Sequence, residues 1–89
     1  MSKLIPNPFN PATVVEFDIP HTSEVSLIVY NILGEEVARL VDHQMMSAGY
    51  QRVSFDASNS PTGIYFYRIT AIDASGQKFV SVKKMMLMK

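Results

Sequence analysis

The chain has 89 residues, which is enough for one domain and too few for two. Hydrophobic residues make up 47% of it, which suits a packed core and argues against disorder. Eight basic and eight acidic residues cancel, so the charge balance disfavours a nucleic-acid binder. Because the chain has no cysteine, neither a disulfide nor a thiolate metal site supports the fold.

Hydropathy along the chain gives no run of about 18 apolar residues, so we expect no transmembrane segment. No charged start followed by an apolar stretch and a small-residue cleavage site is visible. If the chain is a piece of a longer exported protein, its leader lies elsewhere.

Apolar residues alternate with a period of two along most of the chain, which predicts β-strands. In the first strand, Val15, Phe17 and Ile19 share one face, whereas Glu16 and Asp18 share the other. The predicted strands cover residues 13–19, 24–31, 35–41, 50–57, 64–71 and 77–87, with a possible seventh at 3–5.

The segments between these strands are rich in turn-forming residues. Gly34 suits a turn that needs a positive φ, and residues 73–76 suit a hairpin connection. We expect residues 42–49 to form a loop. Short strands separated by turn clusters predict an all-β, antiparallel β-sandwich over residues 12–89, preceded by a proline-rich lead-in segment or linker at 1–11.

Residues that could support catalysis or metal binding are few and scattered. His21 and His43 fall in predicted turns, and no nucleophile elbow, metalloprotease or phosphate-loop motif is present. Oxygens of Asp56, Asn59 and Asp73 could bind calcium, but such residues cap turns far more often. We therefore expect no enzyme activity, no catalytic residues, no metal and no cofactor.

The aromatic run from Tyr65 to Tyr67 allows two interpretations. Tyr65 and Tyr67 share one strand face with Ile69, and exposed rings on such a face could stack on a carbohydrate. A central strand buries one face, however, and tyrosine suits the margin of a core. We therefore favour core packing over a sugar-binding platform.

The last seven residues do not have the composition of an ordinary core strand. From residue 78 onward the chain has four lysines and no acid, and this basic stretch is either a solvated face or a surface that a partner reads. An uncovered end strand can pair with another chain, as a partner's docking edge or in a dimer; alternatively, it closes the sandwich as an interior strand. The segment comprises Lys83, Lys84, Met85, Met86, Leu87, Met88 and Lys89.

Five motifs follow one another along the chain. Besides the last seven residues, they contain Pro6, Asn7, Pro8, Phe9, Asn10, Pro11, Gly34, Val37, Gly49, Asp56, Gly63, Ile64 and Tyr65. In this order they resemble the type A C-terminal sorting domains of the type IX (Por) secretion system of Bacteroidota and relatives. The resemblance covers residues 6–89, and its departures are Ile5 in place of a frequent aromatic residue and a methionine-rich ending.

This resemblance implies an immunoglobulin-like sandwich of about seven strands that carries a sorting signal for a larger cargo in the same chain. Such cargo passes through the periplasm and is recognised by the outer-membrane type IX translocon. In some members a sortase-like peptidase removes the domain, and the cargo reaches the cell surface or the extracellular space. By the same resemblance, residues 83–89 are the recognition element and the three motif glycines are turn positions. An accessory carbohydrate-binding module and a structural immunoglobulin-like spacer are the alternatives.

Overall fold

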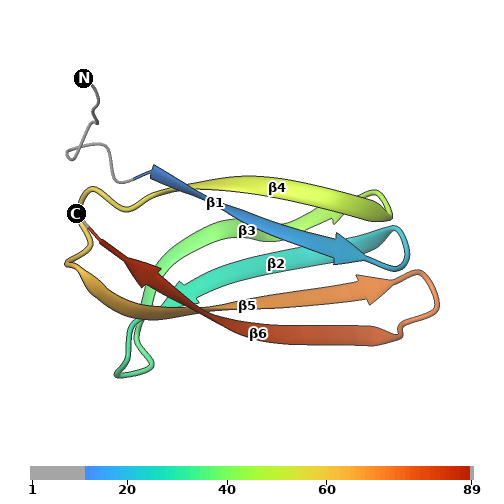
Figure 1. Ribbon diagram of the computed structural model, residues 1–89. Helices are drawn as coiled ribbons and strands as arrows, with labels where there is room; N and C mark the ends of the chain where they lie inside the picture. The colour runs from blue at the N-terminus through green and yellow to red at the C-terminus, as the bar shows by residue number, and fades with distance from the viewer. Residues whose placement is uncertain (1–11, 89) are drawn as a thin grey trace, which may run out of the picture.

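The structure, a computed structural model, describes residues 12–88 of the chain. This part of the chain forms six antiparallel strands and no helix (Figure 1). All six predicted strands are confirmed, and their ends agree with the prediction within two residues, apart from the end of the third. The strands are β1 (Ala12–Ile19), β2 (Ser23–Tyr30), β3 (Glu36–Met46), β4 (Gly49–Asp56), β5 (Gly63–Asp73) and β6 (Lys78–Leu87).

Two antiparallel sheets face each other and enclose the core (Figure 1). One has the strand order β3-β2-β5-β6, and the other consists of β1 and β4. The predicted all-β antiparallel sandwich is therefore confirmed. The possible seventh strand at 3–5 and the proline-rich segment at 1–11 lie outside the described residues.

The core lies between the inner faces of the two sheets, that is, the faces turned toward each other. As predicted, Val15, Phe17 and Ile19 of β1 are buried, while Glu16 and Asp18 point outward. Apolar side chains from both sheets meet in two buried clusters, which include Val25, Leu27, Val41, Ile69 and Ala71 in one, and Val29, Phe55, Ala57, Tyr65 and Leu87 in the other.

The central strand β2 has buried side chains on both faces. Val25, Leu27 and Val29 point into the core and are fully buried, and Ile28 is buried on the opposite, outer face of the sheet. Since β2 is also paired along both edges, with β3 and β5, it is the best-protected strand of the fold.

The predicted loop at 42–49 is wrong, because β3 continues to Met46 and β4 already begins at Gly49. The alternation of apolar residues breaks where β3 forms a bulge opposite Ser26. His43 lies in this bulge with φ 51°, and its N–H donates to Ser26 Oγ at 3.3 Å. His43 was expected in a turn; it lies within β3 because the bulge absorbs the extra residue and the pairing then resumes.

Side-chain oxygens organise the two hairpin turns of the larger sheet. Asn31 Oδ1 accepts the N–H groups of Leu33 and Glu35, and Gly34 follows with the predicted positive φ, 83°. At the other end, Asp73 Oδ1 accepts from Ser75 and Gln77, so the predicted hairpin at 73–76 is confirmed. These local bonds fix the register of β2 with β3 and of β5 with β6.

Candidate functional site: the end of strand β6

Strand β6 is an edge strand of the four-stranded sheet. It pairs antiparallel with β5, from Ile72 opposite Lys78 to Gly63 opposite Leu87, and no other strand within residues 12–88 pairs with it. The sequence left open whether this strand is interior or exposed. The topology decides for an edge whose outward N–H and C=O groups meet no strand of the described fold.

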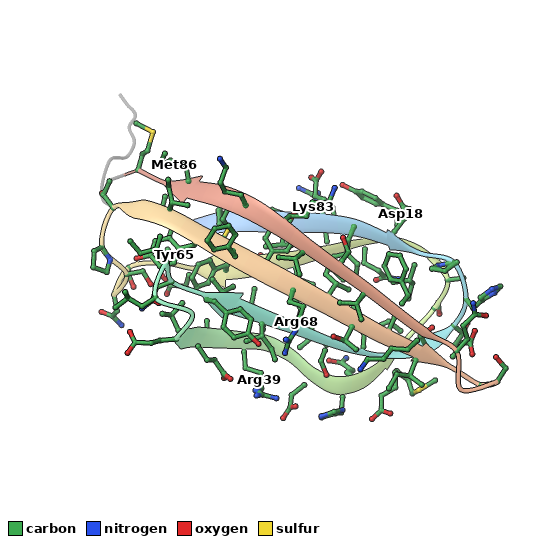
Figure 2. The ribbon with its side chains drawn as sticks, turned by 90° about the horizontal axis from the view of Figure 1, so that it is seen from below. Asp18, Arg39, Tyr65, Arg68, Lys83 and Met86 are labelled. Carbon is green, nitrogen blue, oxygen red and sulfur yellow. The ribbon has the colours of Figure 1, made fainter. Side chains whose placement is uncertain are left out.

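The end of β6 has one buried side and one exposed side. Leu87 is 5% exposed and packs in the core near Tyr65, and the half-buried Met85 contacts the same cluster. Lys84 and Met86 point to the outer face, where Met86 is 58% exposed (Figure 2). The inward side chains therefore anchor the strand, while the outward ones are accessible.

Lys83 points to the inner side of β6 but remains exposed, since the two-stranded sheet does not cover this margin (Figure 2). It lies at a hollow of about 310 Å³ whose apolar wall includes Phe17, Tyr67 and Phe79. The outward carboxylates Glu16 and Asp18 of β1 form part of the same rim. Lys89 lies outside the described residues, and Met88 is exposed.

Residues with potential for catalysis or metal binding do not converge. Asp56 and Asp73 lie at opposite ends of the sandwich, and each carboxylate accepts N–H groups from its own turn. The turn-capping interpretation is therefore confirmed for both. In the range 12–88, no group of three or more His, Asp or Glu side chains could hold a metal ion.

The other motif residues lie at separate places in the fold, some buried and some exposed. Gly34 and Gly49 adopt positive φ in the β2–β3 turn and at the start of β4, where a side chain would strain the backbone. Val37 is an exposed residue of β3, and Asp56 ends β4. Gly63 and Ile64 begin β5, and Tyr65 is 5% exposed, with its hydroxyl donating to Pro61 O at 2.7 Å. The proline-rich motif at 6–11 lies outside the described residues.

A comparison with protein families shows which family the chain belongs to. The family described as "secretion system C-terminal sorting domain" matches residues 3–86, almost the whole chain. The chain belongs to this family. It is a C-terminal sorting domain of type IX secretion, a signal that directs export to the cell surface or the extracellular space. No significant match was found among curated proteins or among solved structures.

Family membership agrees with the features that the structure shows. The family's members are sorting signals rather than catalysts. In the part of the sorting domain that the structure describes, no helix is long and apolar enough to cross a membrane. Tyr65 is buried and Tyr67 is half-buried against the core, so the tyrosines form core packing, as predicted, and not a carbohydrate platform.

Charge is distributed unevenly over the sorting domain. Arg39 forms hydrogen bonds with Glu36 and Asp42, which raise the pKa of Arg39, and the bond from Arg39 lowers the pKa of Glu36. Arg52 lies 3.5 Å from Glu16. By contrast, none of the β6 lysines has a carboxylate within 4 Å among residues 12–88. The cations of β6 are therefore available to a partner.

Sequence reasoning missed two features of the larger sheet. One is the position of His43, which lies 3.4 Å from Glu24 and 3.7 Å from Asp42. The other is the apolar outer face of β5 and β6, on which Val82 is 58% exposed. The sequence did contain a signal for the apolar outer face, because Val80, Val82 and Met86 alternate with inward residues. Only the sheet order shows that no second layer from residues 12–88 covers them.

Proposed function

We propose that the type IX machinery recognises the sorting domain through residues 83–89, by pairing with the free edge at the end of β6. The observation that supports this proposal is the edge position of β6, combined with exposed Lys83, Lys84 and Met86. Main-chain hydrogen bonds to an added strand supply affinity, and exposed side chains supply specificity.

The basic end of β6 favours a partner strand with acidic side chains. Opposite charges across a strand pair are stabilising, and like charges directly opposite are destabilising. Lys83 and Lys84 lie next to each other in a strand that has no acid, so a second copy of β6 is a poorer partner than an acidic strand. A dimer through this edge is the competing outcome, and sedimentation velocity distinguishes the two.

The remaining steps of the route belong to the same proposal. The sorting domain, residues 12–89, follows a cargo domain in the same chain, with residues 1–11 as the connection. The cargo crosses the periplasm and is received by the outer-membrane translocon, and a sortase-like peptidase is a further candidate partner. The sorting domain itself performs no catalysis.

The test is a secreted reporter fused to the full 89-residue chain in a host that has type IX secretion. Removing residues 83–89 is expected to retain the reporter inside the cell. Because this deletion also removes Leu87 from the core, folding is a second explanation for its effect. Lys83→Glu combined with Lys84→Glu changes only exposed side chains and keeps the strand.

The double charge reversal is expected to reduce export while leaving the melting temperature of the purified domain nearly unchanged. Arg52→Glu with Lys78→Glu is the matched control, because it reverses two cations outside the last seven residues. Export of the Lys83/Lys84 variant at the wild-type level, or an equal loss in the control, would contradict the recognition role of the tail.

A further inference from the structure

The outer face of the four-stranded sheet, the side turned away from β1 and β4, carries exposed apolar side chains over β5 and β6, with cations among them. Strand register places Phe66 opposite Lys84, Arg68 opposite Val82, and Ile64 opposite Met86 on this face. Val82 and Met86 are both 58% exposed, although a second layer usually covers apolar side chains on a sheet face. Exposed apolar side chains beside cations are typical of a protein interaction site, where aromatic residues and arginine are enriched.

A hollow of about 360 Å³ lies in this face beside the β2–β3 turn. Its apolar lining comes from Tyr30, Ile32, Phe66 and Val82, and Ile32 stands largely exposed at the turn. The guanidinium carbon of Arg68 lies 5.3 Å from the centre of the Tyr30 ring, at the hollow's margin. The hollow therefore combines an apolar wall with a cation that the ring holds in place.

The two halves of the outer face differ in charge. On the β3 side, Arg39 is engaged by Glu36 and Asp42, and both arginines of this face, Arg39 and Arg68, are labelled in Figure 2. On the β5–β6 side, Arg68 and Lys84 have no carboxylate within 4 Å in the range 12–88. The apolar half is thus also the half with unpaired cations.

We propose that this hollow, the outer-face site, binds a protein segment of the secretion machinery that presents an apolar side chain next to a carboxylate. The apolar side chain would lie against Phe66 and Val82, and the carboxylate would accept from Arg68. The site is continuous with the end of β6 through Lys84, so one partner can hold both. This proposal rests on the proposed function, because it assigns the second contact to the same machinery.

The charge pattern favours a protein segment over an anionic membrane. A bilayer would meet the whole outer face at once, including the carboxylates of Glu24, Glu36 and Asp42 on β2 and β3. Membrane attraction also grows with the number of surface cations, and this half of the face offers few. A segment that covers only β5 and β6 avoids the carboxylates and still reaches the arginine.

The test measures export of the reporter fusion for matched pairs of variants in a host with type IX secretion. Val82→Glu places a charge in the apolar hollow, and Val14→Glu makes the same change on the exposed outer side of β1. Arg68→Gln removes the hollow's cation, and Arg52→Gln removes an exposed arginine from β4. Thermal unfolding of each purified variant shows that it is folded.

We expect Val82→Glu and Arg68→Gln each to reduce export by roughly tenfold, because each variant removes one contact with the partner. Both controls should export normally. Normal export of the two site variants would overturn the proposal. Two further results would overturn it: a sorting domain that cosediments with vesicles of phosphatidylglycerol and phosphatidylethanolamine only when Arg68 is present, or one that forms a dimer that Val82→Glu dissociates.

The outcomes separate this inference from the proposed function. If the Lys83/Lys84 variant exports normally and Val82→Glu does not, the outer-face site is supported and the recognition role of residues 83–89 is contradicted. If Val82→Glu exports normally and the Lys83/Lys84 variant does not, the recognition role is supported and the outer-face site is contradicted. Reduced export of both variants supports one partner that contacts β6 and the hollow.

Discussion

The contrast between β2 and β6 separates what holds this sorting domain together from what it presents. Strand β2 is paired along both edges, and five of its eight side chains are buried. Strand β6 is paired along one edge, and Leu87 is its only buried residue. Stability therefore comes from the middle of the sheet, and the edge is left free to change or to bind without unfolding the domain.

The largest expected effect is on the free energy of unfolding at the centre of β2. Leu27→Ala deletes a fully buried side chain, and the lost transfer energy plus the cavity should cost about 2–5 kcal/mol. Val82→Ala, on the exposed side of β6, should change it by no more than about 0.5 kcal/mol. Urea unfolding of both variants measures the difference. Equal costs would mean that the outer face of β6 is covered.

An intermediate effect is expected where β5 supports the end of β6. Tyr65→Phe removes the hydroxyl that donates to Pro61 O at 2.7 Å, and should cost about 0.5–1.5 kcal/mol. Tyr50→Phe, which changes a largely exposed tyrosine of β4, is the control and should cost less. If the two variants unfold at the same urea concentration, the Tyr65 bond does not contribute to stability.

The smallest effect is expected at the β5–β6 hairpin and depends on pH. Hydrogen bonds from the Ser75 hydroxyl, and then from the N–H groups of Gln77 and Ser75, lower the pKa of Asp73 from its ordinary value of 3.8. The contribution of the carboxylate to stability is therefore present above that value and lost as the pH falls through the lowered pKa.

Asp73→Asn should thus lower the melting temperature slightly at pH 7. It should also make the melting temperature fall less when the pH is lowered. Thermal unfolding between neutral and strongly acidic pH measures this, with Asp18→Asn, on an exposed strand face, as the control. A variant with the same pH dependence as the wild type would show that the turn bonds of Asp73 do not stabilise the hairpin.

Several features of the fold and the site could be predicted because they depend on neighbours in the sequence. Alternation placed Val15, Phe17 and Ile19 inward, and turn chemistry placed Gly34 and Asp73. The β3 bulge at His43 could not be predicted, since it depends on how β3 meets Ser26 of another strand. For the same reason the pattern gave a loop where β3 continues.

The sequence by itself determined the all-β class, the six strands, the turns and, through its ordered motifs, the family. Local backbone preference and side-chain alternation act over a few residues, so the local sequence is enough to predict them. Only the tertiary structure decided that β6 is an edge, that Leu87 is anchored while Met86 is exposed, and that no second layer from residues 12–88 covers the outer face over Phe66 and Val82. These properties depend on which strand lies beside which, and strand order results from the packing of the whole sheet.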